Sequence, residues 1–209
     1  MAQTLAVLAS GGGTNFQAIL DAIAEGCLKS EVVLVASNKE EAGALDRGHA
    51  AGVRAEWVPP GDDYNDRLHS LLEEVSPDLI VLAGYMKLIA TKTVKQWKGR
   101  MVNIHPALLP AFGGKGMYGI HVHEAILQRG VKVTGVTVHV VDEEYDRGPI
   151  IAQRVVPVLD DDTPEVLQKR VLKREHKLYP EVLQWFAEGR IRIEDNRVYG
   201  AEVDPIFMP

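Results

Sequence analysis

The first half of the chain alternates between short apolar runs and segments in which apolar residues recur at helical spacing. Apolar runs bounded by glycine, proline or polar residues predict strands at 5–9, 31–37, 53–58 and 79–83. Apolar residues three or four positions apart predict helices at 16–23, 42–51, 64–75 and 91–97. Such alternation is typical of βαβ units with right-handed crossovers. We therefore predict an α/β fold with a doubly wound, mostly parallel sheet.

A late antiparallel hairpin is expected in the second half. Residues 133–141 alternate and are rich in β-branched side chains, and residues 150–158 return as a second strand. The turn between them, residues 142–149, is acidic. Such a turn is normally solvated, and it gains chemical interest only if it folds toward a reactive group.

A long helix and a small hairpin complete the pattern. Asp162 or Thr163 caps a helix that begins with Pro164 and ends at Gly189. Residues 191–199 predict a terminal hairpin. We expect one domain over residues 1–200 and a tail over residues 201–209.

Residues 101–110, Met-Val-Asn-Ile-His-Pro-Ala-Leu-Leu-Pro, predict a strand that stops at a proline. Because side chains alternate along a strand, Asn103 and His105 point the same way and Val102 and Ile104 point into a core. Ligand sites of open α/β sheets lie at the carboxyl ends of strands. An amide beside an imidazole suits chemistry at a carbonyl, because both can bind a developing oxyanion. The alternative is a polar strand end with a surface histidine.

A glycine-rich turn, Ser-Gly-Gly-Gly-Thr-Asn at residues 10–15, joins the first strand to the first helix. Glycines allow close approach of a ligand, and a helix N-terminus offers free N–H groups to an anion. Phe16 occupies the position of the third glycine of a dinucleotide fingerprint, and no P-loop Gly-Lys-Ser/Thr follows. The turn therefore indicates a phosphate or similar anion, with an unliganded tight turn as the alternative.

Composition narrows the classes of partner. The chain has 209 residues, 46% hydrophobic and 25% charged, as in a soluble globular protein. A net charge of −6 argues against a nucleic-acid partner and leaves room for a small phosphorylated ligand. With Cys27 as its one cysteine, the chain needs no oxidising compartment. No apolar run approaches the roughly 20 residues of a membrane span. We expect a cytoplasmic protein with no membrane partner.

Metal chemistry is not expected either. His121 and His123 are two positions apart on a predicted helix and therefore face different sides of it. No cysteine or acidic cluster completes a ligand set around them, so the sequence does not predict a zinc site.

The order and spacing of four stretches can be compared with those of known families: residues 10–15, 84–89, 103–110 and 139–149. In that order and spacing the chain resembles the glycinamide ribonucleotide formyltransferases, folate-dependent enzymes of purine synthesis, from about Leu5 to Tyr199. The Asn-x-His-Pro-x-Leu-Leu-Pro signature, with a later Asp before x-Gly-Pro, marks the wider superfamily of 10-formyltetrahydrofolate hydrolases and formyltransferases. The Ser-Gly-Gly-Gly-Thr-Asn loop narrows the resemblance to the glycinamide ribonucleotide branch.

The resemblance implies a fold, a reaction and its ligands. The fold is Rossmann-like, the formyltransferase fold. The formyl group of 10-formyltetrahydrofolate, a cosubstrate, passes to the amine of glycinamide ribonucleotide, giving formylglycinamide ribonucleotide and tetrahydrofolate. No metal is required. The partners are small molecules, and the chain is expected to be a monomer or a homodimer.

The resemblance also implies roles for residues. The catalytic trio is Asn103, His105 and Asp146. The ribonucleotide contacts are Gly13, Thr14 and Asn15, with Glu175 at its glycinamide and ribose end. The folate contacts are Met86, Lys87, Leu88, Ile89, Asn103, Asp142, Glu143, Glu144, Tyr145 and Asp146. Two positions depart from some members: Leu172 stands where they carry glutamine, and Gly61 follows Pro60 where they carry an arginine.

Other readings stay open at this point. Within the superfamily they are a formyltetrahydrofolate hydrolase and a formyltransferase acting on a nucleotide sugar or on methionyl-tRNA. We expect no regulatory domain before the first strand and no added C-terminal domain, which disfavours the hydrolase and the tRNA enzyme. A phosphate-binding module without catalysis is the alternative from another class. The coincidence of Asn103, His105 and Asp146 disfavours it, because binding alone does not require them.

Overall fold

The computed structural model describes residues 2–202, and the chain divides into two compact units, Met1–Asn103 and Ile104–Pro209. Each unit is described by itself. The single domain over residues 1–200 stays a prediction. Of the expected tail, Ala201 and Glu202 have no regular structure, and residues 203–209 lie outside the described residues.

The first unit contains parallel strands in the order β3-β2-β1-β4-β5. Their bounds are β1 (Gln3–Ala9), β2 (Ser30–Ser37), β3 (Ala55–Trp57), β4 (Leu79–Leu82) and β5 (Met101–His105), of which the last runs into the second unit. The chain order reverses between β1 and β4. A reversal of this kind opens a crevice at the carboxyl ends of the two strands, where α/β proteins place ligands.

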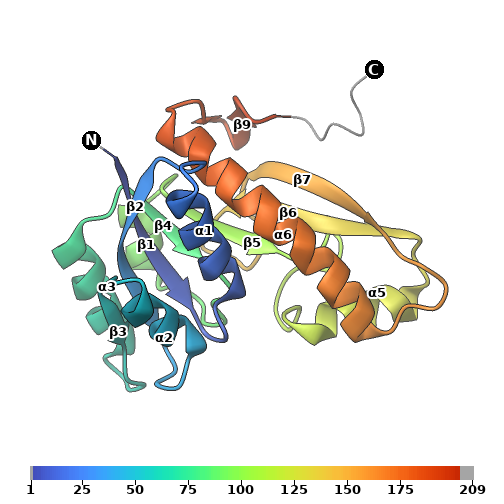
Figure 1. Cartoon of the computed structure of the whole chain (residues 1–209), viewed down its shortest axis with the longest axis horizontal. Helices are drawn as coiled ribbons and strands as arrows, with labels where there is room; N and C mark the ends of the chain where they lie inside the picture. The colour runs from blue at the N-terminus through green and yellow to red at the C-terminus, as the bar shows by residue number, and fades with distance from the viewer. Residues whose placement is uncertain (1, 203–209) are drawn as a thin grey trace. The chain divides into compact units, whose positions relative to one another are not determined.

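Four helices join these strands, as the apolar spacing predicted (Figure 1). They are α1 (Thr14–Ala24), α2 (Gly43–Ala50), α3 (Tyr64–Val75) and α4 (Thr91–Gln96). Of the predicted α3 stripe, Tyr64, Leu68 and Leu72 are buried, whereas Leu71 and Val75 are half-buried. The core of this unit includes β1 from Leu5 to Ala9, which is completely buried. The parallel α/β part of the predicted fold is therefore confirmed.

The second unit is built on the antiparallel pair β6 (Val133–Val140) and β7 (Ile150–Pro157), the predicted late hairpin. The register shifts between Val138 and His139, which face Ala152 and Ile150, so β7 carries one additional residue there. Helix α5 (Ile120–Arg129) precedes the pair, and the long helix α6 (Pro164–Ala187) packs along it (Figure 1). The strands β8 (Arg192–Glu194) and β9 (Arg197–Tyr199) form the predicted terminal hairpin.

Helix α6 shows how local sequence sets an element's start. Thr163 is its N-cap, and the Thr163 hydroxyl accepts a hydrogen bond from the backbone N–H of Val166 at 3.3 Å. Pro164 occupies the first helical position, where its missing N–H costs nothing. Within the described residues, no helix has the length and apolar character needed to cross a bilayer.

Candidate active site

Strand β5 carries two of the predicted catalytic side chains at its end. Val102 and Ile104 are buried in the core, and Asn103 and His105 lie two positions apart, so they project to the same side of the strand. His105 is only 3% exposed, whereas Asn103 is half-buried. The imidazole is thus not the surface histidine of the alternative interpretation.

The carboxylate of Asp146 faces His105 in the second unit. Its Oδ2 lies 3.6 Å from His105 Nδ1, and both side chains are largely buried. On the other edge of the ring, Nε2 of His105 lies 2.8 Å from the carbonyl oxygen of Phe112. A carbonyl only accepts, so Nε2 carries the hydrogen and Nδ1 turns toward the carboxylate. The acidic turn therefore does fold toward His105.

A second histidine, His139, flanks the same carboxylate and was not among the predicted site residues. Its Nε2 lies 3.5 Å from Oδ1 of Asp146, and its Nδ1 donates to the carbonyl of Val140 at 2.9 Å. His139 is 2% exposed. Each imidazole thus gives one N–H to a backbone carbonyl and turns its other nitrogen to Asp146, so the three groups can hold an additional proton between them.

The backbone at Asp146 and Gly148 adopts a conformation that few residue types allow. Asp146 has φ of +57°, a left-handed conformation that aspartate tolerates better than most residues. The N–H of Gly114 donates to Oδ2 of Asp146 at 2.8 Å. A Cβ on Gly148 would lie 1.8 Å from the carbonyl oxygen of Val140. Only glycine fits there, which gives a physical reason for the Gly-Pro that follows the acidic turn.

Burial and charge set the protonation of this cluster. Burial lowers the pKa of His105, and the nearby Asp146 carboxylate offsets this only in part. Burial raises the pKa of Asp146, but His139, His105 and the Gly114 N–H outweigh it and hold that pKa below its usual range. At neutral pH the site therefore presents an ionised carboxylate beside a neutral His105, an arrangement that can accept a proton.

The rest of the predicted acidic loop lies nearer solvent. Glu143, Glu144 and Tyr145 are exposed, and Asp142 is half-buried and accepts a hydrogen bond from the N–H of Glu144 at 3.0 Å. Glu175, on α6, is 7% exposed; burial, and to a smaller extent the charge of Glu175, raises the pKa of Tyr179. In the second unit the structure brings His105, Asp146 and His139 together and places Glu175 on the buried face of α6.

The glycine turn of the first unit leads directly into α1. Gly13 is the N-cap, with φ of +70°, and no side chain caps the helix there. A Cβ on Gly13 would lie 2.7 Å from the Cα of Ala44, so the turn requires glycine at this position. Thr14 is exposed at the first helical position, whereas Asn15 is 8% exposed. The N-cap therefore supplies no side-chain acceptor to the first turn of α1, and the anion site expected there stays a prediction.

Ser10 ties this turn to the loop after β4. Its Oγ donates to Oδ1 of Asn38 at 2.6 Å and accepts from the N–H of Met86 at 2.9 Å. Its own N–H donates to the carbonyl of Gly84 at 3.1 Å. Ser10 is 1% exposed. One buried hydroxyl thus joins the loops that follow three neighbouring strands, β1, β2 and β4.

The predicted folate segment shows two kinds of side chain. Met86 and Leu88 are exposed by 44% and 48%, whereas Ile89 is 4% exposed and packs inside. The Lys87 ammonium lies 3.6 Å from the centre of the Tyr64 ring. This cation–π contact and the Ser10 contacts fix the segment to its neighbours within the first unit.

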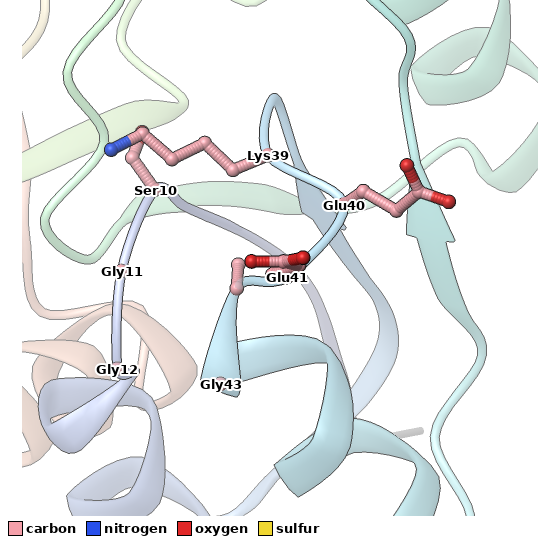
Figure 2. Close-up of a pocket in the computed structure, with 8 residues that line it drawn as sticks. Ser10, Gly11, Gly12, Lys39, Glu40, Glu41 and Gly43 are labelled. Carbon is pink, nitrogen blue, oxygen red and sulfur yellow. The ribbon is translucent and has the colours of Figure 1, made fainter.

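An open pocket of about 570 Å³ lies beside the glycine turn. Its walls are residues 10–12 and residues 39–43 (Figure 2). In Figure 2 the Lys39 side chain extends toward Ser10, and the Glu40 side chain points away from the turn. Among the described residues, no group of three histidine, cysteine or acidic side chains is placed to hold a metal ion.

Comparisons with known proteins agree with this geometry. The formyl transferase family model matches residues 3–183. The phosphoribosylglycinamide formyltransferase of Escherichia coli is 37% identical over 93% of this chain and 92% of its own length. The chloroplastic phosphoribosylglycinamide formyltransferase of Arabidopsis thaliana is 44% identical over 93% of this chain and 68% of its own.

A solved structure supports the same relationship. The crystal structure of glycinamide ribonucleotide transformylase 1 from Symbiobacterium toebii superposes with a TM-score of 0.89 at 42% identity, covering 96% of this chain and 95% of that one. Sequence and fold thus agree over nearly the full length of this chain. The chain belongs to the formyl transferase family, and within it to the phosphoribosylglycinamide formyltransferases.

Proposed function

We propose that this chain transfers the formyl group of 10-formyltetrahydrofolate to the amine of glycinamide ribonucleotide, giving formylglycinamide ribonucleotide and tetrahydrofolate, a step of purine biosynthesis. The observation that supports it most is the buried carboxylate of Asp146 beside His105, at the end of the strand that carries Asn103. Formyl transfer requires an oxyanion stabiliser and a proton carrier at one carbon, and these residue types supply both.

The amine of the ribonucleotide attacks the formyl carbon, which forms the new C–N bond and a tetrahedral oxyanion. Asn103 donates a hydrogen bond to that oxygen. The Nε2–H of His105 donates to the same oxygen, which takes the place of the Phe112 carbonyl. Such donors are worth most in a site from which water is excluded.

The proton released by the attacking amine passes to the Asp146 cluster, directly or through water. Asp146 is suited to this because its carboxylate stays ionised at neutral pH and has imidazole nitrogens on both sides. Collapse of the intermediate breaks the bond from carbon to the folate nitrogen, and that nitrogen gains a proton from the cluster. Proton balance is kept with no covalent enzyme intermediate and no metal.

Substrate contacts complete the proposal. The ribonucleotide phosphate binds at Gly13, Thr14 and Asn15, where α1 begins, with Glu175 at its glycinamide and ribose end. The folate binds against residues 86–89 and the loop of residues 142–146. We further propose that the protein acts in the cytoplasm as a monomer or homodimer, without a nucleic-acid partner.

The test is formyl transfer measured with a panel of acceptors. 10-Formyltetrahydrofolate is supplied with glycinamide ribonucleotide, with an amino nucleotide sugar, with methionyl-tRNA, or with buffer alone. We expect folate release only with glycinamide ribonucleotide, in step with formylated product. Folate release in buffer alone would indicate a hydrolase. Formyl transfer to another acceptor would identify that acceptor as the substrate in place of glycinamide ribonucleotide. Folate binding without release would indicate a binding module.

A further inference from the structure

Helix α2 donates hydrogen bonds to two carbonyl groups of the glycine turn. The N–H of Ala44 donates to the carbonyl oxygen of Gly11 at 3.1 Å, and Nε of Arg47 donates to the carbonyl oxygen of Gly12 at 2.8 Å. A Cβ on Gly43 would already touch Gly12, so the two segments are in close contact. Two successive peptide groups of the turn are therefore fixed by one helix.

The orientation of these carbonyls determines where the amides point. In a trans peptide the C=O of one residue and the N–H of the next point in opposite directions. Because the carbonyls of Gly11 and Gly12 point to α2, the N–H groups of Gly12 and Gly13 point away from it. The turn thus offers consecutive donors on one side, which is how a backbone binds a phosphate.

Arg47 is itself held in place. Its second guanidinium nitrogen donates to Oε1 of Gln17 on α1 at 2.8 Å, and Nε2 of Gln17 donates to Oδ1 of Asp21 at 2.8 Å. The arginine therefore bridges α1 and the glycine turn with two bonds from one planar group. A lysine keeps the charge but cannot make both bonds in this geometry.

We propose that Arg47 is a positioning residue for the ribonucleotide phosphate, acting through the Gly12 carbonyl rather than by touching the ligand. This inference rests on the proposed function, in which the phosphate binds at the turn. It predicts an effect confined to one substrate. Loss of the two bonds lets the peptide between Gly12 and Gly13 rotate, so the donors lose their preset direction.

The experiment compares Arg47→Lys with the unmodified chain in steady-state formyl transfer. We expect the KM for glycinamide ribonucleotide to rise about 10-fold, the effect of losing a charge-assisted hydrogen bond. The kcat and the KM for 10-formyltetrahydrofolate stay within about 2-fold. Inorganic phosphate, used as a competitive inhibitor against the ribonucleotide, should lose affinity by the same factor as the KM change. Gln17→Ala, which removes only the second anchor, should give a smaller rise of about 3-fold.

The matched control is Arg54→Gln, an arginine of the same unit that pairs with Glu56 and Glu74 at the surface; it should change neither KM. Arg47→Lys with an unchanged ribonucleotide KM would overturn the inference, because charge alone would then suffice. Equal increases in both KM values with a lower kcat would overturn it in favour of a general structural role. An unmodified chain that transfers no formyl group to the ribonucleotide would instead refute the proposed function.

Discussion

Nε2 of His139 lies 3.5 Å from Oδ1 of Asp146. The other carboxylate oxygen, Oδ2, lies 3.6 Å from Nδ1 of His105. The contact of His139 lies where the register of the β6–β7 pair shifts: Val138 faces Ala152 and His139 faces Ile150, so the additional residue, Ile151, belongs to β7. Such irregularities of pairing are common beside active sites. His139 helps to keep the carboxylate of Asp146 ionised, because its contact lowers the pKa of that carboxyl.

Replacing His139 should move the acid limb of the pH profile. Because His139 helps to hold the pKa of Asp146 down, His139→Asn should raise that pKa and shift the acid limb of kcat toward higher pH. We expect the loss of turnover to be largest at acid pH, where the carboxylate of the variant is protonated first. His121→Asn, on the exposed side of α5, is the control and should leave the profile unchanged. An unshifted acid limb in His139→Asn would contradict the role given to His139.

The oxyanion donors should matter for turnover and not for folding. Asn103→Ala and His105→Ala should each lower kcat by about 100- to 1000-fold, the usual cost of one such donor. Circular dichroism and thermal unfolding should show that both variants keep the native fold. Near-native turnover in either one would remove that residue from the mechanism.

Alanine variants of two glycines at opposite ends of α1 distinguish the effect of backbone strain from that of steric contact. Gly13 and Gly26 have φ of +70° and +75°, but only at Gly13 would a Cβ meet another residue. Gly26→Ala should therefore cost about 1 kcal/mol of unfolding free energy and leave kinetics unchanged. Gly13→Ala should cost more and also raise the ribonucleotide KM at least 10-fold. Equal kinetics for the two variants would show that the turn does not bind this substrate.

His123 should make stability depend on pH. It is 2% exposed, and in the described part of the chain its Nδ1 is buried with no hydrogen-bond partner. Burial and the charge of His105 lower the pKa of His123 to about 4. An unfolded histidine titrates near 6.5, so as pH falls from about 6.5 to about 4 the unfolded chain binds a proton that the native chain does not. The free energy of unfolding should decrease by about 3 kcal/mol over that range.

Denaturant unfolding at a series of pH values tests this. His123→Leu should lose its share of the pH dependence, so its curve should be flatter than that of the unmodified chain between about pH 6.5 and 4. His121→Leu removes an exposed histidine from the same helix and should keep the original slope. Parallel curves for the unmodified chain and His123→Leu would show that His123 titrates in the native chain as it does in the unfolded one, which would contradict the prediction.

The sequence was sufficient to predict the elements and the end of β5. Helix α3 has the predicted bounds, because its apolar residues recur at helical spacing over the whole segment. Strand β5 stops at His105, because Pro106 has no backbone N–H to donate. Strand β3, expected at residues 53–58, covers only Ala55–Trp57, since its pairing with β2 extends over three residues.

Contacts between distant segments could not be predicted in this way. His139 appeared as one more residue of an alternating strand, and its contact with Asp146 is made only because the acidic turn folds back toward the strand end. The sole hint in the sequence was a histidine at the strand end, immediately before the acidic turn. The hydrogen bonds of Ser10 and Arg47 join residues 76 and 35 positions apart, and no local pattern encodes such pairings.

The most direct test of the account is a single-turnover experiment with radiolabelled formyl-folate and excess enzyme. With glycinamide ribonucleotide present, the unmodified chain should move the label into formylated product, one for each folate released. Without it the label should stay on the folate, and His105→Ala should show no transfer within the time the unmodified chain needs. Release of label to water without the ribonucleotide, or full transfer by His105→Ala, would contradict the proposed function and mechanism.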